Sequence, residues 1–118
     1  MASGTLLTAA LGLILGYLLL RAFLNHRSRP GKEQMTSLLE NGAIILDVRT
    51  SQEFSEGHAP GSRNIPLDRL AAQLPQLDRK KPILVCCASG ARSGMAKSML
   101  EKAGFAAVSN VGPWQRLL

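Results

Sequence analysis

The sequence predicts an α/β domain with an open parallel sheet flanked by helices, preceded by one transmembrane helix. Short aliphatic runs at residues 43–48 and 82–86 are typical of strands that are buried on both faces. Helical patterns alternate with these runs along the chain, as in α/β folds. A long uncharged apolar run near the N-terminus predicts the membrane helix. The length of 118 residues suits about one domain.

The apolar run begins at residue 6 and stays free of charge to residue 20. Extended to residue 24 it makes a helix of roughly 28 Å, close to the hydrocarbon thickness of a bilayer. We therefore expect residues 5–24 to form a transmembrane helix, with the stem of Arg21 reaching the headgroups. A cleaved signal peptide and a buried core helix are the alternatives. The signal peptide lacks basic side chains in residues 1–5 and a small-residue cleavage site.

Basic residues near this helix lie only on its C-terminal side. Residues 21–32 contain four of the fourteen lysines and arginines and no acid, and residues 25–34 read as a polar basic linker. The positive-inside rule then predicts a single-pass protein whose C-terminal domain is cytoplasmic, with membrane lipid as a partner. No basic face interleaved with aromatics is present, so nucleic acid is not an expected partner. Gly12 and Gly16 form a small-residue step that suits a homodimer through the membrane helix.

Residues 35–118 hold the predicted domain, and local signals mark several of its boundaries. Gly42 suits the left-handed end of a helix, and Thr50 with Glu53 has the spacing of a capping box. Asp68 is expected to cap a helix that runs to about residue 74. The other expected elements are helices at 35–41, 51–56 and 93–103 and strands at 43–48, 64–65, 82–86 and 107–109. The buried face of the last helix is predicted to carry Met95, Ala96, Met99, Leu100 and Ala103.

The two cysteines, Cys86 and Cys87, are neighbours in the chain. Adjacent cysteines rarely pair, and two alone make neither a disulfide framework nor a metal site, so a reduced thiol is expected. Successive side chains of a strand point to opposite faces, so only one of them can face the loop that follows. We expect Cys87 to face the loop and Cys86 to be a small buried residue, with a resolving thiol as the alternative for Cys86.

The segment from Cys87 to Ser93 lies between a predicted buried strand and a predicted helix. Gly90 permits a tight path, so the backbone N–H groups can form an anion cradle at the N-terminus of the helix. Such surroundings favour thiolate over thiol at Cys87. Arg92 adds a charged donor fork, which predicts binding of an anionic substrate and ordering of the loop.

Residues 87–93 resemble the active loop of single-domain rhodaneses, and further signatures follow the family order. These signatures are Asp47-Val48-Arg49, Glu53-Phe54, residues 57–66 and residues 110–114. The resemblance implies a sulfurtransferase that moves sulfane sulfur from an anionic donor such as thiosulfate to a thiol or cyanide through a persulfide on Cys87. It also implies no metal and no organic cofactor. The implied substrate-binding residues are Ala88, Ser89, Gly90, Ala91, Arg92 and Ser93, with Asp47 and Arg49 in support. The alternatives are a solvated surface charge for Arg92 and a structural carboxylate that caps local N–H groups for Asp47.

Two departures from the family pattern bear on this expectation. Cys86 stands where an aromatic residue is frequent, and family members usually continue beyond the tryptophan, here Trp114, so a shortened last element is expected. Two other functions use the same fold. One is a non-catalytic rhodanese-like binding module. The other is a cysteine phosphatase or arsenate reductase, whose loops typically place five residues between Cys and Arg, whereas four separate Cys87 from Arg92.

Overall fold

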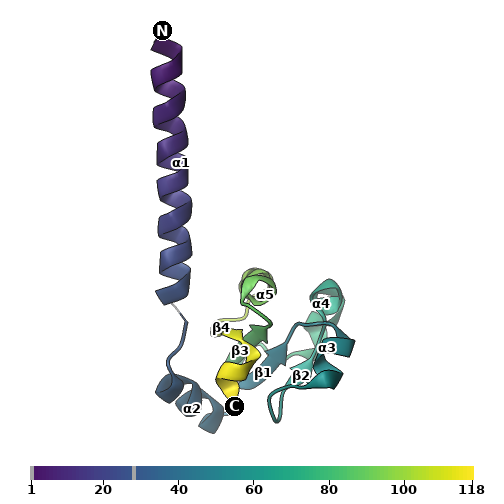
Figure 1. Cartoon of the computed structure of the whole chain (residues 1–118). Coiled ribbons are helices and arrows are strands. Elements are labelled where there is room, and N and C mark those ends of the chain that lie inside the picture. The colour runs from purple at the N-terminus through teal and green to yellow at the C-terminus, as the bar shows by residue number, and fades with distance from the viewer. Residues whose placement is uncertain (1, 28) are drawn as a thin grey trace.

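The N-terminal helix α1 (Ala2–Arg27) extends away from an α/β domain in the computed structural model of the chain (Figure 1). The structure describes residues 2–27 and 29–118, and within α1 the side chains of residues 4–21 and 23. The stretch Gly4–Arg21 is long and apolar enough to cross a membrane, and none of it is buried inside the molecule. That exposure disfavours the core helix of a soluble protein, whereas a signal sequence would pass the same test of length and composition.

The connection between α1 and the domain is shorter than the predicted linker over residues 25–34. Helix α1 continues to Arg27, and α2 (Lys32–Glu40) already begins at Lys32. Residue 28 of the predicted linker lies outside the described residues. Helix α2 also starts three residues before the predicted 35–41, with Glu33 in its first turn, where a negative charge is favourable. It ends as expected, because Gly42 takes the left-handed conformation at φ +87°.

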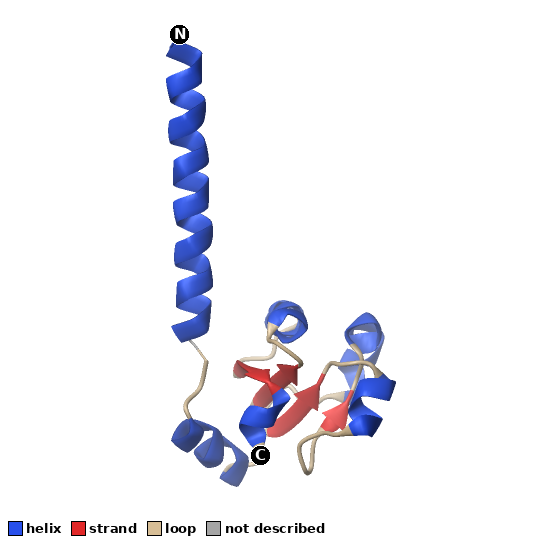
Figure 2. Ribbon diagram, viewed as in Figure 1, coloured by secondary structure: helices blue, strands red, loops and turns tan. Residues whose placement is uncertain are grey.

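The predicted open parallel sheet flanked by helices is confirmed (Figure 2). Its four strands lie in the order β2-β1-β3-β4, which the sequence does not predict. Their bounds are β1 (Ile44–Asp47), β2 (Arg63–Asn64), β3 (Ile83–Cys87) and β4 (Val108–Pro113). β1 and β3 pair side by side in the centre, and every residue of β3 is buried. Since all four strands run in the same direction, their carboxyl ends meet at one edge of the sheet, where sites of α/β proteins usually form.

Each face of the sheet is covered by its own apolar layer. The first layer joins Ile83, Val85 and Cys87 of β3 to α4 (Leu67–Gln73) and α5 (Ala91–Lys102). The second joins Leu84 and Cys86 to Met35 of α2, with Trp114 and Leu117 of the short helix η2 (Trp114–Leu117) packed against it. The alternation along β3 therefore separates the two cysteines, and the prediction that they face opposite sides is confirmed.

The pairing of β3 with β4 contains a register shift. Val85 lies opposite Asn110, but Cys86 lies opposite Gly112, so Val111 is an extra residue in β4. A bulge of this kind bends a strand and redirects its side chains. The predicted strand at 107–109 is thus too short, since β4 runs on through a glycine and a proline that ordinarily mark a loop.

The remaining helices confirm one boundary and correct two predictions. Helix α3 (Ser51–Glu56) starts with the complete Thr50–Glu53 capping box, as predicted. The prediction that Asp68 caps α4 is wrong, because Pro66 takes the cap position and Asp68 lies in the first turn. Met95 is 55% exposed, so its assignment to the buried face is also wrong. Helix α5 starts at Ala91, and the residues that it buries are Ser93, Ala96 and Leu100. A short helix η1 (Leu74–Gln76) follows α4.

Candidate active site

The Cys87 side chain lies where β3 ends and the loop into α5 begins, and it has no exposed surface. Its sulfur accepts the N–H of Gly90 at 3.0 Å and the N–H of Ser93 at 3.4 Å, and the Ser93 hydroxyl lies 3.3 Å away. Gly90 makes this path possible, because its φ of +111° is rarely adopted by other residues. The loop therefore turns its donors inward onto one sulfur atom.

These contacts act on the thiol in opposite directions. Burial alone would raise the pKa of Cys87, because it disfavours the charged form. The hydrogen bonds from the Ser93 hydroxyl and from the N–H groups of Ser93, Gly90 and Ser89 outweigh burial and hold the pKa of Cys87 below its ordinary value. The site thus stabilises a thiolate in a place from which water is excluded.

The Ser93 hydroxyl links Cys87 to Asn110. Ser93 Oγ lies 2.7 Å from Asn110 Oδ1, and the latter also accepts the N–H of Gly112 at 3.0 Å. A hydroxyl has one proton, so with a neutral thiol Ser93 donates to Asn110 and accepts from the S–H group. When the thiol ionises, the same hydroxyl can turn its proton to the sulfur, and Asn110 keeps its bond from Gly112. That switch replaces the Ser93–Asn110 hydrogen bond with one to the thiolate, and the Gly112 N–H still satisfies Asn110 Oδ1.

Cys86 has surroundings of the opposite kind. It is fully buried in the layer of Met35, Leu84 and Val111. Burial, helped by the negative charge of Asp47, raises the pKa of the Cys86 thiol to about 12. The side chain is directed away from the loop, so the geometry does not place it to resolve a sulfur adduct on Cys87.

Arg92 lies in the first turn of α5, and its guanidinium is bound to Glu53 of α3. Nη1 and Nη2 donate to the two carboxylate oxygens at 2.7 and 3.0 Å. The bond with Arg92, followed by the Thr50 N–H, lowers the pKa of Glu53 to about 2. About a third of each side chain is exposed. Arg92 thus joins the loop after β3 to α3, a pairing that the sequence analysis does not anticipate.

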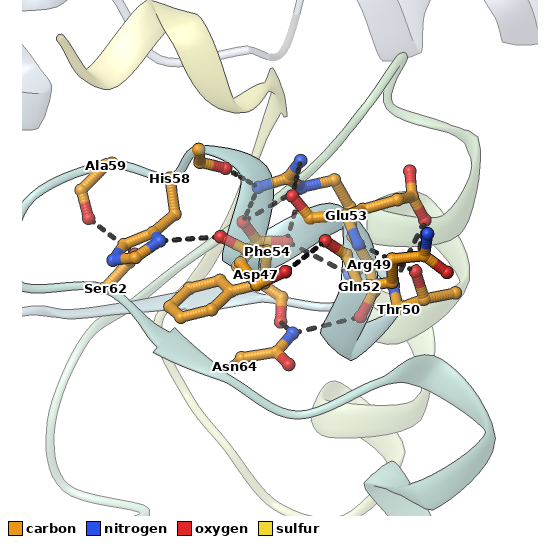
Figure 3. A network of polar contacts seen from close by, with 12 residues as sticks. Asp47, Arg49, Thr50, Gln52, Glu53, Phe54, His58, Ala59, Ser62 and Asn64 are labelled. Carbon is orange, nitrogen blue, oxygen red and sulfur yellow. Dashed lines mark hydrogen bonds and ion pairs between the residues drawn. The ribbon is translucent and has the colours of Figure 1, made fainter.

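Asp47 and Arg49 form a buried ion pair at the carboxyl end of β1 (Figure 3). The Asp47 carboxylate accepts the Arg49 N–H at 3.0 Å and Nη2 at 2.8 Å. Arg49 also donates to the carbonyls of Glu53 and Gly57 at 3.2 and 2.7 Å, and its guanidinium lies 4.8 Å from the Trp114 ring centroid. The pair therefore holds α3, and with it the carboxylate that binds Arg92.

The other predicted substrate-binding residues lie where β3 leads into α5, next to Cys87. Ala88, Ser89 and Ala91 are exposed around the buried Gly90. His58, which lies in the quoted signature over residues 57–66, follows α3, stacks on Phe54 with ring centroids 3.7 Å apart and places Nδ1 2.7 Å from the Phe54 carbonyl oxygen. Sequence reasoning missed the bond of Glu53 to Arg92 and the role of Asn110, although both residues lie within the quoted signatures. It also missed Arg29, whose Nη2 donates to the Ser89 carbonyl at 3.3 Å.

Comparison with known proteins places this geometry in a family. The model of the rhodanese-like domain matches residues 32–112. The chain is 40% identical over 72 residues to YrkF of Bacillus subtilis (strain 168). The aligned segment covers 61% of this chain but only 39% of YrkF. It is 36% identical over 80 residues to the thiosulfate sulfurtransferase GlpE of Pseudomonas aeruginosa (strain PAO1), covering 68% of this chain and 73% of GlpE.

A solved structure shows the same fold. The Escherichia coli rhodanese with anions superimposes with a TM-score of 0.55 at 32% identity, covering 64% of this chain and 91% of that chain. The family model spans well over half of the 118 residues and includes Asp47, Arg49, Cys87 and Arg92. The chain therefore belongs to the rhodanese-like domain family.

Proposed function

We propose that this protein is a sulfurtransferase in which the Cys87 thiolate takes a sulfane sulfur from a thiosulfate-like donor and passes it to a thiol or cyanide. The observation that carries the proposal is the set of donors around Cys87, with N–H groups of Gly90 and Ser93 and the Ser93 hydroxyl within 3.4 Å of the sulfur. The similarity to a protein named as a thiosulfate sulfurtransferase supports it.

The proposed reaction has two displacement steps. The Cys87 thiolate attacks the outer sulfur of thiosulfate, an S–S bond forms on Cys87, the donor's S–S bond breaks, and sulfite leaves with the electron pair. An acceptor thiolate or cyanide then attacks the outer sulfur and releases the Cys87 thiolate. The inward N–H groups stabilise negative charge on the sulfur in each state. No net oxidation occurs.

Access to the sulfur is part of this proposal. Cys87 has no exposed surface, so a donor reaches it only after the loop opens or the side chain rotates. The exposed residues Ala88 and Ser89 form the part of the loop that can move with little loss of packing. Arg92, whose fork is bound to Glu53, is proposed to order the loop and to present its exposed edge to the anionic end of the donor.

Intact-mass spectrometry of the full chain after thiosulfate treatment tests the function. The wild type and Cys86→Ala should gain the mass of one sulfur atom, and the gain should disappear with a reducing thiol. Cys87→Ala should gain nothing. If the folded wild type gains no sulfur from thiosulfate or from other sulfane donors, the non-catalytic binding module replaces the sulfurtransferase.

We further propose that α1 anchors the domain in a membrane with residues 29–118 in the cytoplasm. The length and apolar composition of Gly4–Arg21 support the anchor, and the basic residues that follow it support the orientation. N-terminal sequencing of the membrane-bound protein should find α1 retained, whereas a signal peptide would be missing. Protease added outside sealed spheroplasts should leave the domain intact, and its digestion there would reverse the orientation.

We also propose that two copies of α1 pair in the membrane through Gly12 and Gly16. No described atom outside α1 lies within 4 Å of a Cβ built at either glycine, so the step is open to a second helix. Crosslinking in membranes should weaken in Gly12→Ile and Gly16→Ile. Equal crosslinking in wild type and both variants would make the glycines lipid-facing surface.

A further inference from the structure

The segment that follows α1 is fastened to the domain close to the active loop. Pro30 is fully buried, and its carbonyl accepts Nη2 of Arg116 at 2.8 Å. The same guanidinium donates through Nη1 to the Val111 carbonyl of β4 at 2.6 Å. Arg29 is thereby held at the carboxyl edge of the sheet. It is half-buried there, although the sequence places it in a basic linker beside the membrane.

The Arg29 guanidinium occupies space that two glycines leave free. A Cβ built on Gly112 would lie 2.9 Å from Arg29 Cζ, and one built on Gly90 would lie 2.5 Å from Arg29 Nη2. Real Cβ atoms do not approach other atoms so closely, so side chains at these positions would push the guanidinium away. The position of the Arg29 guanidinium in this structure therefore depends on the absence of a side chain at both glycines.

The bond that Arg29 makes is with the peptide unit that contacts the reacting sulfur. Arg29 Nη2 donates to the Ser89 carbonyl at 3.3 Å. That carbonyl and the Gly90 N–H belong to one planar unit, and the Gly90 N–H donates to Cys87 Sγ at 3.0 Å. Holding the oxygen from outside fixes the direction of the N–H inside. A cationic donor on the carbonyl also polarises the peptide and strengthens its N–H as a donor.

We propose that Arg29 is a positioning residue of the active site, which holds the Ser89–Gly90 peptide with its N–H directed at Cys87 and so connects the segment after α1 to the reacting thiol. Asn110 holds the same loop from the other side, because its Nδ2 donates to the Gly90 carbonyl at 3.2 Å. The proposal deepens the proposed function, since it assigns a residue to the surroundings of the same cysteine.

The test measures the Cys87 thiol itself, without sulfur transfer. Full-length protein in detergent, with Cys86→Ala in every sample, is alkylated with iodoacetamide across a range of pH. Arg29→Ala should shift the alkylation profile to higher pH and slow the reaction at neutral pH about tenfold, the effect of losing one charge-assisted hydrogen bond. Lys32→Ala is the matched control, because it removes an exposed positive charge from the same segment and should leave the profile in place.

Salt separates a bond from a general charge effect. Raising ionic strength from about 0.05 M to about 0.5 M screens separated charges strongly but leaves a contact bond largely intact. The difference between Arg29→Ala and its parent should therefore persist at high salt. The proposal is overturned if Arg29→Ala leaves the alkylation profile unchanged. It is also overturned if the difference between Arg29→Ala and its parent disappears at high salt, or if Lys32→Ala shifts the profile by the same amount. Failure of the proposed function has a separate signature, since it is the absence of sulfur on Cys87 in the wild type.

Discussion

Two neighbouring thiols of one strand experience opposite surroundings in this protein. Cys86 is enclosed by apolar side chains between the sheet and α2, where burial raises its pKa to about 12. Cys87 is equally inaccessible on the other side, yet its pKa is lowered. Both residues have zero exposed surface, so exposure does not separate them.

The difference between them is the supply of hydrogen-bond donors. Cys87 lies at the end of the strand, where the chain leaves the ladder and its N–H groups are free to turn toward a side chain. Cys86 lies one residue earlier, where its carbonyl still accepts the N–H of Val48, the residue that follows β1. A shift of one residue along the backbone therefore separates a thiol whose pKa is raised from one whose pKa is lowered.

The largest expected effect comes from removing each thiol in turn. Cys87→Ala should abolish sulfur transfer, and Cys86→Ala should keep most of it, because only Cys87 has donors that stabilise a thiolate. Steady-state assays with thiosulfate and cyanide measure both variants. If Cys86→Ala loses activity while circular dichroism shows that it is folded, the assignment of the reacting thiol to Cys87 is wrong.

The next largest effect is expected at Arg92, whose guanidinium lies in the first turn of the helix that follows Cys87. Arg92→Ala should lower kcat/KM for thiosulfate about ten- to a hundredfold, since a charged hydrogen bond contributes about 1.5–3 kcal/mol. Glu53→Gln is the informative partner variant. If Arg92 acts mainly by ordering the loop, Glu53→Gln should also lower activity, whereas a freed guanidinium that binds donor better would raise it.

The ion pair also has a defined pH range. Its carboxylate has a folded pKa of about 2, below the ordinary 4.5, so the stabilisation is present above pH 4.5 and is lost as pH falls through 2. Acid unfolding of the wild type should therefore be steeper than that of Glu53→Gln between these values.

Ser93→Ala should raise the pKa of the Cys87 thiol, in the direction of the raised pKa of Cys86. The variant removes the hydroxyl 3.3 Å from the sulfur but keeps the N–H of residue 93. Its thiol pKa should rise, and alkylation at neutral pH should slow about tenfold. The absorbance of the thiolate in the ultraviolet, followed against pH in a Cys86→Ala background, gives the pKa directly. An unchanged titration would show that the Ser93 proton stays with Asn110.

The smallest effect concerns Cys86 and alkaline stability. Its folded pKa of about 12 exceeds the ordinary 9.0, so the unfolded chain releases the proton first and stability falls as pH rises above 9.0. Urea titrations should show that Cys86→Ala lacks this part of the alkaline decline. It should nevertheless be less stable than the wild type at neutral pH, because the substitution leaves a cavity. Parallel declines in both proteins would contradict the buried neutral thiol.

Local patterns predict much of this fold and the position of Cys87. The aliphatic runs become β1 and β3, the Thr50–Glu53 spacing becomes a real capping box, and strand alternation separates the cysteines. Each of these depends on residues that are close in sequence. The bond of Glu53 to Arg92 could not be predicted in this way, because it joins residues that are 39 positions apart in the sequence.

The missed features all need tertiary context. Met95 is exposed because α5 buries the face that carries Ser93, Ala96 and Leu100, and Met95 lies outside that face. The continuation of β4 through Gly112 and Pro113 is set by its pairing with β3 rather than by strand propensity. Arg29 looks like one more membrane-proximal charge until the domain brings Gly90 and Gly112 against it.

The bulge in β4 has a consequence for the tolerance of this chain to length changes. Val111 is the extra residue between the partners of Val85 and Cys86, and it fills the layer beside α2 while Asn110 bonds to Ser93 and Gly90 on the other side. Deleting Val111 would bring the pairing of β3 with β4 back into regular register. No residue would then be left to fill the apolar layer beside α2 while Asn110 bonds on the opposite face of the sheet. A single-residue deletion here, a few positions from the C-terminus, should therefore disturb both the apolar layer and the hydroxyl beside Cys87.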